Sequence, residues 1–600
     1  MTPTIFDIET NGIKDFRFLT DLKKIHCLIT RHKNDVKIWT GSAIKDGLAF
    51  LALQDVIVGH NSISFDIPAI KKLYPEWEPK GCVRDSLVMA RLAWSDQKER
   101  DYRNADLPKN LIGSHSLKAW GYRLGEHKGD YSGGWDDLNE DMIKYCEQDT
   151  LVTQRLYLAA SKKLGECKAT ALEHSFHEIL CQQERNGFAF NTKAAAELYA
   201  TLSGLRADLK SQLSKVYPAQ TERMKMPQYW VAEDRRFKTK GEAKKAGFRD
   251  KQIKRGPNRT KVVPFNPDSR LQISQVLMEH HDWEPTVFTP NGQPQVDETI
   301  LKSLEIPEAD LLVRYLTLSK RIGQLAEGKE AWLKVEDNGK IHGRINSNGA
   351  ITGRCTHSRP NLSATPALTA IWGKDCRSLF TASSGRVLVG VDASGLELRC
   401  LAHYLSRWDN GEYAKLIVES DIHEVNRQAA GLSSREAAKT LIYALIYGAG
   451  PQKIGSIVNG GIREGKRLTE RFLQRIPALR TLKDAVTEAA NKRGKITGLD
   501  GRSITTRSAH SALNTLLQSC GAILMKQATV NARLAFRASK LEVFQVAHIH
   551  DEIQFECSPE HSEEVGEMAV EAIKQAGRSF NLKCPLDGEH KAGKTWADTH

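Results

Sequence analysis

Two carboxylates near the start of the chain have the residue types and the spacing to hold a metal ion. Asp7 and Glu9 lie two residues apart in the apolar segment TPTIFDIET, which is typical of a buried strand. Their side chains would point to the same face of that strand. Buried carboxylates on one face repel each other unless a cation lies between them. An Asp-x-Glu triplet is weak evidence by itself, so further partners are needed.

Two more segments supply such partners. Asp66 ends an N-x-x-x-F-D pattern that begins at Asn61, directly after the apolar segment VIVGH. Tyr145 and Asp149 have i,i+4 spacing in a helix predicted for residues 141–163, so they share a helix face. Carboxylate oxygens are ligands that Mg²⁺ prefers. The alternative, surface acids plus an ordinary helical pair, is disfavoured because all these residues fall within predicted elements.

A second pair of acids stands far apart in the sequence. The predicted strand VLVGV ends in Asp392, ahead of a helix that Ser394 could cap, which leaves Asp392 available as a metal ligand. The segment VAHIHDEIQF places His550, Asp551 and Glu552 within an apolar strand or a tight hairpin. If the strand is continuous, Asp551 shares its apolar face, where an unpaired carboxylate costs several kcal/mol. We therefore expect Asp392 and Asp551 to share a cation.

A helix predicted between these two acids carries charged and aromatic side chains on one face. Ser433 and Glu436 form a capping box at its start. The exposed face carries two cations and then two aromatic rings at intervals of four residues: Arg435, Lys439, Tyr443 and Tyr447. The opposite face is an apolar stripe of Ala438, Leu441, Ile442 and Leu445. The exposed face suits a ligand with a polyphosphate at one end and a flat base at the other, and His423 could add a phosphate contact.

A later helix presents the polar residues His510, Asn514 and Gln518 opposite several leucines. Uncharged side chains of this kind can read the hydrogen-bond acceptors that all base pairs offer in a DNA groove. A polar face turned to solvent explains the same pattern nearly as well.

Composition limits the class of protein. The chain has 600 residues, enough for about four structural units, and 40% of them are hydrophobic and 26% charged, which is too apolar for disorder. No apolar stretch approaches the length of a membrane span, and Asp7 and Glu9 stand where a signal peptide would be apolar. The 11 cysteines form no C-x-x-C pair, which favours reduced cytosolic thiols over disulfides or a zinc site.

The net charge of +13 is concentrated in one segment. Residues 216–264 contain 14 Lys and Arg and 5 Asp and Glu, a net charge of 14 − 5 = +9, with no clear periodicity. A basic block of this kind indicates a polyanionic partner, and the alternative is a solvated loop.

The first three acidic segments, in their order and spacing, resemble the DnaQ-like 3′–5′ exonucleases over about residues 1–165. The resemblance implies hydrolysis of phosphodiesters with two metal ions. It also implies that Tyr145 orients the attacking water and that four acids hold the metals: Asp7, Glu9, Asp66 and Asp149.

The motifs DASGLELR, REAAKTLIYALIYG and HDE resemble motifs A, B and C of the family A DNA polymerases. TGRCTHSRPNLSATP, ALNTLLQSCGA, DNGEY and RIGQLAEG are most similar to the replicative polymerases of T-seven-type phages. The resemblance implies a multidomain α/β fold, in which an RNase H-like exonuclease domain precedes a right-hand polymerase. The implied function is template-directed addition of deoxynucleotides to a primer 3′ end in phage replication, with 3′–5′ proofreading.

The resemblance also implies domain boundaries. The exonuclease domain would cover residues 1–165 and the thumb residues 166–340, including the basic block. The palm would be divided between residues 341–420 and 536–600, with the fingers and adjoining helices at 421–535.

Roles for individual residues follow from the same resemblance. Two Mg²⁺ ions are expected at each site, with Mn²⁺ as a substitute. The polymerase metals would be held by Asp392, Asp551 and the Ala393 carbonyl, and Glu552 belongs to the same catalytic motif. The triphosphate would be bound by Arg435, Lys439 and His423, with Lys439 placed to protonate the leaving group.

The remaining roles concern the sugar, the template and the duplex. Tyr443 would pack on the incoming sugar and base, Glu397 would block a 2′-hydroxyl, and Tyr447 would guard the template slot. The primer end would be touched by His550, and minor-groove geometry would be checked by Arg354, Asn514 and Gln518. Some relatives carry Phe at the position of Tyr443. Because the phenol can supply a hydroxyl near the sugar 3′ position, we expect efficient use of dideoxynucleotides. His600 resembles a terminal His near the family's active site.

The expected partners are primer-template DNA and dNTPs, with a phage helicase-primase as a further candidate, in the host cell cytoplasm and away from membranes. In the phage family an insertion at the basic block docks host thioredoxin. Here the insertion looks shorter and matches poorly, so thioredoxin, another processivity factor and a direct DNA clamp all stay open. The block's Tyr229, Trp230, Phe237 and Phe248 offer a protein-docking alternative.

Three other readings compete with this one. A phage-type RNA polymerase is disfavoured by Glu397 and by the exonuclease residues. A non-catalytic DNA-binding relative is disfavoured because all six acids are present. A nuclease alone is disfavoured by the helix from Arg435 to Tyr447.

Overall fold

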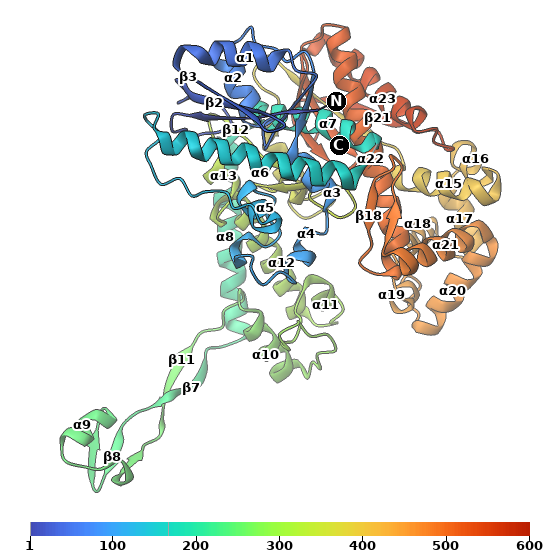
Figure 1. Cartoon of the computed structure of the whole chain (residues 1–600). Coiled ribbons are helices and arrows are strands. Elements are labelled where there is room, and N and C mark those ends of the chain that lie inside the picture. The colour runs from blue at the N-terminus through green and yellow to red at the C-terminus, as the bar shows by residue number, and fades with distance from the viewer. Residues whose placement is uncertain (1, 166) are drawn as a thin grey trace. The chain divides into compact units, whose positions relative to one another are not determined.

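The computed structural model describes residues 2–165 and 167–600 of the chain (Figure 1). The chain forms two compact units. The first comprises Met1–Phe190, Glu336–Leu368 and Cys376–His600, and the second comprises Asn191–Val335 and Thr369–Asp375. Within the described residues, no helix has the length and apolar character needed to cross a membrane.

A five-stranded sheet forms the N-terminal part of the first unit. Its strands are β1 (Thr4–Thr10), β2 (Ile25–His32), β3 (Asp35–Thr40), β4 (Val56–Gly59) and β5 (Cys82–Asp85). Their order is β3-β2-β1-β4-β5, and β1 pairs antiparallel with β2 and parallel with β4. The central strand therefore carries the first two acids, and the strands predicted at TPTIFDIET and VIVGH are confirmed.

Helices cover both faces of this sheet. They include α1 (Ile44–Ala52), α2 (Asp66–Leu73), α3 (Ser86–Ala93), α5 (Leu117–Leu124) and α6 (Glu140–Leu164). In Figure 1, α1 and α2 lie above the sheet and α6 runs along its other side, where it packs on β1 and β2. The Asn139 side chain caps α6 by accepting a hydrogen bond from the Met142 N–H at 2.8 Å. The helix predicted for residues 141–163 is confirmed.

A four-stranded antiparallel sheet lies in the C-terminal part of the same unit. Its strands are β16 (Val387–Ala393), β19 (Phe544–Ile549), β20 (Glu552–Cys557) and β21 (Gly588–Gly593), in the order β19-β20-β16-β21. The helices α22 (Ala512–Ala538) and α23 (Ser562–Ser579) pack on each other, and α23 also packs on β16.

The segment around Asp551 is a tight hairpin and not a continuous strand. β19 ends at Ile549 and β20 begins at Glu552, so His550 and Asp551 form the turn. His550 has φ +59°, a left-handed conformation that such turns require. Of the two alternatives that the sequence offered, the tight hairpin is confirmed, and the turn releases the Asp551 side chain from the pleat.

Seven helices connect the strand β16 to α22. They are α15 (Leu396–Asp409), α16 (Glu412–Glu419), α17 (Ile422–Ala430), α18 (Arg435–Ile446), α19 (Pro451–Ser456), α20 (Ile462–Arg475) and α21 (Pro477–Arg493). Two predicted caps need correction. The Ser434 hydroxyl, not that of Ser433, caps α18 by accepting the Ala437 N–H at 3.1 Å. The helix α15 starts after Gly395 without a side-chain cap, so Ser394 does not fill that role. Ile446 completes the buried stripe of α18, whereas Leu445 is only half-buried.

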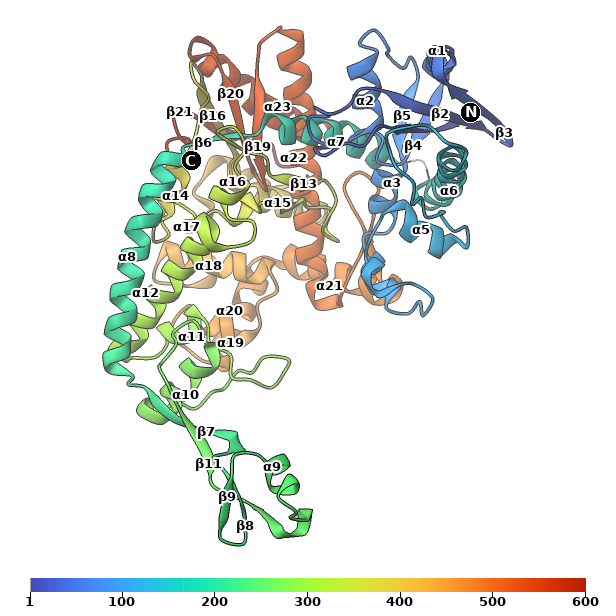
Figure 2. The ribbon, with the colours of Figure 1, turned by 90° about the vertical axis from the view of Figure 1, so that its left-hand side faces the viewer.

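A long helical pair forms the second unit. α8 (Thr192–Val216) lies beside α12 (Pro307–Ile322), as Figure 2 shows, and the shorter α10 (Arg270–His281) and α11 (Glu298–Lys302) complete the unit. A two-stranded ribbon of β7 (Gln220–Pro227) and β11 (Asn258–Val263) leads from α8 to a small terminal lobe (Figure 1).

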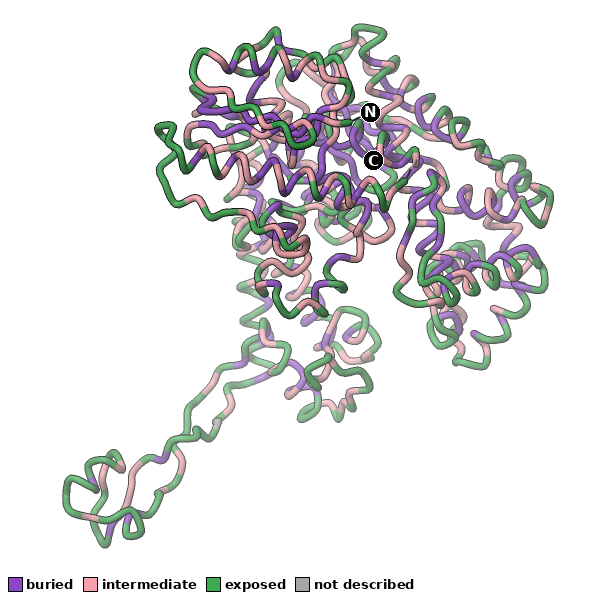
Figure 3. The backbone as a smooth tube through the Cα atoms, in the orientation of Figure 1, coloured by how far each residue is buried: buried purple, intermediate pink, exposed green. Residues whose placement is uncertain are grey.

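The basic block is this ribbon and lobe, so it is structured despite its lack of periodicity. The lobe contains β8 (Trp230–Ala232), β9 (Arg235–Phe237), α9 (Lys240–Lys245) and β10 (Ile253–Arg255). Its core is Ala232, Ala243 and Ile253, against which Trp230, Phe237 and Phe248 pack. Three-residue strands are too short to show a period of two. Most of the ribbon and lobe is exposed (Figure 3).

A buried ionic cluster ties the N-terminal and C-terminal parts of the first unit together. Glu173, on α7 (Lys168–Asn186), forms ion pairs with Arg502 at 2.7 Å and with Lys526 of α22. Arg502 also pairs with Asp500 at 2.6 Å. The side chains of all four residues are at most 3% exposed. Such a cluster is stable only when every charge has its partner.

Candidate active sites

The first acid set comes together at the central strand of the five-stranded sheet. Asp7 and Glu9 lie on β1, and their ligand atoms lie within 4.8 Å of one another and of the Cys146 sulfur. Asp66 is the first residue of α2, and Asp149 lies on α6. The structure therefore gathers all four predicted carboxylates from three elements.

The pKa values of these carboxylates reflect how close together they lie. Burial, together with the charges of Asp149, Glu9 and Asp66, holds the pKa of Asp7 far above its usual value. Burial and the charge of Asp149 likewise raise the pKa of Glu9. The pKa of Asp66 rises for the same reasons, burial first. Buried acids whose pKa values are raised by burial and by neighbouring carboxylates form a strong cation site.

One cation of the chain itself already lies in this site, and no sequence pattern predicted it. Lys128, from the loop between α5 and α6, forms a short ion pair with Asp149 and lies 4.5 Å from the centroid of the Tyr145 ring. Its ammonium lowers the pKa of Asp149, although burial is the larger effect and leaves that pKa raised. Cys146 was also missed, and its sulfur lies 3.4 Å from Asp7 Oδ2. No spacing rule links a loop lysine to these motifs, so only the fold could identify it.

The second acid set lies at one end of the C-terminal sheet. In the strand ladder Asp392 is opposite Glu552 on β20 and Glu589 on β21. The Ala393 N–H donates a hydrogen bond to the Asp551 carbonyl at 3.1 Å, which fastens the end of β16 to the β19–β20 turn. Asp392 and Asp551 therefore lie at the same edge of the sheet, as expected, and both are exposed.

The acids at this edge differ in their electrostatics. Partial burial and the charges of Asp551 and Glu552 raise the pKa of Asp392 to about 7. The pKa of Asp551 is raised as well, mainly by burial. Burial would raise the pKa of Glu552 too, but hydrogen bonding from His600 and the charge of Arg377 hold it below its usual value.

Glu552 is therefore held by the protein, while Asp392 and Asp551 are left for a ligand. The Glu552 carboxylate accepts a short hydrogen bond from the Trp596 indole, and it pairs with His600 at 3.1 Å and Arg377 at 3.6 Å. The last residue of the chain thus reaches the candidate site, as the sequence pattern suggested for His600.

The helix α18 carries the cations and aromatic rings at the predicted spacing. The rings of Tyr443 and Tyr447 stack with centroids 6.3 Å apart, and His423 on α17 lies 6.4 Å from Tyr443. Lys439 is exposed on the same helix. Arg435 forms an ion pair with Asp421 at 2.6 Å, so it must leave that partner to bind a phosphate.

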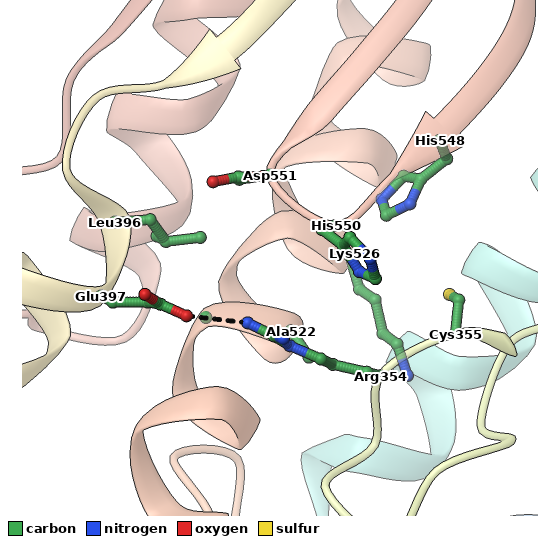
Figure 4. A pocket seen from close by; sticks show the side chains of 10 residues that line it. Arg354, Cys355, Leu396, Glu397, Ala522, Lys526, His548, His550 and Asp551 are labelled. Atoms are coloured by element: carbon green, nitrogen blue, oxygen red, sulfur yellow. Dashed lines mark hydrogen bonds and ion pairs between the residues drawn. The ribbon is translucent and has the colours of Figure 1, made fainter. Parts of the chain in front are cut away.

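Two other residues with predicted roles of their own contact Glu397. The Tyr447 hydroxyl donates to both Glu397 oxygens at 2.7 Å, and Arg354 Nη2 donates to Oε1 at 3.0 Å. Figure 4 shows Arg354 reaching across a narrow pocket to Glu397, with His550 and Asp551 also lining it. Glu397, Tyr447 and Arg354 thus form one hydrogen-bonded set, although separate roles were predicted for them.

The predicted groove-reading face is only partly assembled. Asn514 and Gln518 lie half-buried on α22, and His510 is exposed in the short 3₁₀ helix Ala509–Ser511 ahead of it. Neither amide lines the pocket at Arg354. The buried Oδ1 of Asn514 has no hydrogen-bond partner among the described residues, which is unusual for a buried acceptor.

Both acid sets fit divalent cations. Each offers hard carboxylate oxygens, and each raises its own acids' pKa values when no cation is bound. In the first set, Asp149 Oδ1 is buried without a hydrogen-bond partner among the described residues, as a metal ligand would be.

Comparison with known proteins identifies the family. The model of DNA polymerase family A matches residues 243–598. The DNA-directed DNA polymerase of Enterobacteria phage T3 is 35% identical over 709 aligned positions, which cover 99% of this chain and 100% of that protein. The enzyme of Escherichia phage T7 is 36% identical with the same coverage. The alignments exceed the 600 residues of this chain, so both relatives contain residues that it lacks.

The fold agrees with this result. The solved structure described as the POL domain of Pol1 from M. smegmatis, in complex with DNA primer-template and dNTP, matches with a TM-score of 0.76. The match covers 99% of this chain and 96% of that one at 19% sequence identity. From the family model and the two full-length relatives it follows that this chain belongs to the family A DNA polymerases and catalyses template-directed DNA synthesis.

Proposed function

We propose that this polymerase extends a primer at the site of Asp392 and Asp551 and proofreads it at the site of Asp7 and its three partner acids. The observation that carries the proposal is the presence of two separate carboxylate sets, one per sheet, each with acids whose pKa values are raised by burial and by neighbouring carboxylates. When bound, divalent cations would activate the attacking oxygen and stabilise the leaving group. We expect two Mg²⁺ ions per site, with Mn²⁺ as a substitute.

At the polymerase site, Asp392, Asp551 and the Ala393 carbonyl would hold these cations. Arg435, Lys439 and His423 would bind the dNTP triphosphate, and Lys439 would carry the proton for the leaving pyrophosphate. Arg435 now pairs with Asp421 at 2.6 Å, so it can bind a phosphate only after it leaves that carboxylate.

The other residues of this site would select the substrate and hold the DNA. Tyr443 would pack on the incoming sugar, and Glu397, fixed by Tyr447 and Arg354, would exclude a 2′-hydroxyl. His550 would contact the primer end. Asn514 and Gln518 would report on groove geometry.

At the exonuclease site, Asp7, Glu9, Asp66 and Asp149 would hold the cations and Tyr145 would orient a water. The five-stranded sheet with Asp7 and Glu9 on its central strand supports this assignment. We assign the exonuclease domain to residues 1–165 and the thumb to 166–340. We assign the palm to 341–420 and 536–600 and the fingers to 421–535.

Primer extension with variants of the full chain tests the two assignments together. Asp392→Asn should abolish extension with dNTPs and keep degradation of a single strand, whereas Asp7→Ala should do the reverse. The matched controls are Glu567→Gln, an exposed acid on α23, and Asp46→Asn, an exposed acid on α1. Extension that survives Asp392→Asn would refute the site. Extension with NTPs as efficient as with dNTPs would instead favour an RNA polymerase.

We further propose that the basic lobe grips duplex DNA. Every Lys and Arg of residues 216–264 is exposed except Lys240, which is half-buried. Three of the four aromatic residues pack on the lobe's own core and so are not free to form a docking surface. A cationic surface around a small core suits a phosphate backbone.

Replacing residues 220–263 by a short Gly-Ser turn tests the clamp. Products on a long primed template should become shorter, and the logarithm of DNA affinity should depend less steeply on the logarithm of salt concentration. Unchanged product length would reject the clamp. Adding thioredoxin to the intact chain separates the alternatives, since longer products would show a processivity partner. Replication with a phage helicase-primase in the host cytoplasm is the expected setting.

A further inference from the structure

A sulfur atom lies among the carboxylates of the first acid set. We propose that Asp7, Glu9 and Cys146 together bind a thiophilic divalent cation such as Zn²⁺, in competition with Mg²⁺. The inference rests on the proposed exonuclease and concerns which cation its site selects. Cys146 is not one of the acids of the sequence motifs, and the absence of a C-x-x-C pair disfavours a zinc site on sequence alone.

The first observation is the spacing of the ligand atoms. One oxygen of Asp7, one of Glu9 and the Cys146 Sγ all lie within 4.8 Å of one another, and the described residues contain no other such group of His, Cys, Asp and Glu. The Cys146 Sγ lies 3.4 Å from Asp7 Oδ2. Bonds of about 2.3 Å to sulfur and about 2.0 Å to oxygen place two such ligand atoms about 3.5 Å apart around tetrahedral zinc. The two atoms are therefore already near the separation that a shared zinc ion requires.

The second observation is that the fold fixes the sulfur beside the acids. Cys146 lies on α6, which packs on β1 and β2. Its side chain is fully buried and belongs to a small apolar cluster with Cys27 and Ile29 of β2. Asp7 and Glu9 lie on one face of β1. A ligand that is held by packing loses little conformational entropy when it binds, so the group is preorganised.

The third observation is an unsatisfied oxygen next to this group. Asp149 is 4% exposed, and its Oδ1 has no hydrogen-bond partner among the described residues, while Lys128 pairs with Oδ2. Of the neighbouring charges, that of Asp149 has the largest effect on the pKa of both Asp7 and Glu9, so this carboxylate lies close to them. A fourth ligand atom from Asp149 would complete the tetrahedral set that zinc prefers.

The sulfur changes which cation the site favours. Mg²⁺ is a hard cation that takes oxygen ligands, whereas Zn²⁺ also binds thiolate strongly. When zinc binds, the thiol releases its proton to solvent and coordinates as a thiolate. A thiol that only filled the core and donated a weak hydrogen bond to Asp7 would have no effect on the choice of metal. Metal selectivity therefore separates the two roles of Cys146.

A cobalt(II) titration of the full chain without DNA tests the inference, because a cobalt–thiolate bond gives a charge-transfer band in the near ultraviolet. The wild type should show this band, saturating at one cobalt ion per chain, and Zn²⁺ should remove it at a far lower concentration than Mg²⁺. Cys146→Ser and Cys146→Ala should abolish the band, and Asp7→Asn should weaken cobalt binding. The controls Cys27→Ser, at a buried thiol of the same cluster, and Cys82→Ser, at an exposed thiol, should keep it.

The dependence of Tm on the Zn²⁺ concentration gives a second measurement. Zinc affinity should fall at least about tenfold in Cys146→Ser, since even the loss of a partner outside the coordination sphere costs that much. Equal zinc affinity in the wild type and Cys146→Ser would reject the sulfur ligand.

The outcomes also separate this inference from the proposed exonuclease. A wild type without the band, or a band that persists in both Cys146 variants, would overturn the zinc site. Equal loss of the band in Cys27→Ser would assign the effect to packing of the cluster and would also reject it. A wild-type chain that shows the Cys146-dependent band but fails to degrade single strands in Mg²⁺ would reject the exonuclease and support the zinc site.

Discussion

The two acid sites of this polymerase handle the same problem, like charges held close together, in different ways. At the proposed exonuclease site the carboxylates are packed between a central strand and two helices, and Lys128 partly neutralises them. At the polymerase site Asp392 and Asp551 lie at an exposed sheet edge, and the chain's own donors bind Glu552 instead. The first site is thus built as a closed cage and the second as an open edge.

The difference in burial suits the substrate proposed for each site. At the proposed exonuclease site a terminal phosphodiester would enter alone, so burial could concentrate charge around it. The proposed polymerase site would accept a primer end and a triphosphate together, and its candidate phosphate-binding side chains, Arg435 and Lys439, lie on a separate helix, α18. Because three donors hold Glu552, this acid lies next to Asp392 without being a third free carboxylate at the open edge.

The largest effect expected from this comparison is at the hairpin turn. Asp551→Asn should reduce extension by about a thousandfold or more, since a metal ligand supports several kcal/mol of transition-state stabilisation. Glu552→Gln should cost no more than about a hundredfold, because Trp596 can still donate to it. Single-turnover extension rates measure both. Equal losses of extension rate in the two variants would show that Glu552 is a metal ligand too. The distinction between a free Asp551 and a held Glu552 would then be wrong.

The next largest effect concerns the link between the sites. Glu173→Ala leaves the buried Arg502 and Lys526 without their shared partner and should lower the free energy of unfolding by about 3–5 kcal/mol. Denaturant unfolding of the full chain measures it, with Glu178→Ala, a largely exposed acid on the same helix, as the control. A loss below about 1 kcal/mol would show that the cluster contributes little to joining the two sites.

A smaller effect distinguishes the aromatic residues of the polymerase site. Tyr443→Phe should increase discrimination against dideoxynucleotides by about tenfold, the value of one hydrogen bond of about 1.4 kcal/mol. The ratio of kcat/KM for a dNTP and its dideoxy analogue measures this. Tyr447→Phe is the matched control, because its hydroxyl is bonded to Glu397. Strong rejection of dideoxynucleotides by the unchanged chain would contradict the prediction.

The smallest expected effect is the pH dependence of stability that the buried acids of the first site cause. The pKa of Asp66 is raised to about 7 and that of Glu9 to about 9, so these two carboxyl groups bind more protons in the folded chain than in the unfolded chain. Buried histidines whose pKa is lowered to about 3, such as His60 and His548, act in the opposite direction below pH about 6.5. Without metal, stability should therefore fall as the pH rises from about 7 to about 9, by a few degrees in Tm. Mg²⁺ should remove most of the slope, and Asp7→Asn should reduce it. A Tm that rises with pH over this range in EDTA, in the unchanged chain, would contradict this assignment.

Much of both sites could be predicted from local sequence. Asp7 and Glu9 on a strand and Tyr145 with Asp149 on a helix follow from periods of two and of about four residues, because those periods fix the face on which a side chain lies. The face of α18 followed in the same way. The caps at Ser434 and Gly395 were missed, because neighbouring residues could fill the same role.

Periodicity could not predict which side chains from distant segments contact each acid. Lys128 comes from a loop, Cys146 from the buried side of α6, and the Glu552 donors from the chain's last turn and from Arg377. The lobe also lacked a period because its strands are three residues long.

The sequence by itself determined which residues bear chemistry, since the acids, the cations and the aromatic rings are encoded at spacings that local geometry preserves. It also determined that the excess charge belongs to one segment. Only the tertiary structure decided that Asp551 is released by a turn while its neighbour Glu552 is held, and that a loop lysine enters the cage of Asp7. The physical reason is that burial and long-range contacts set the charge state of a carboxylate, and both arise only when distant segments pack together.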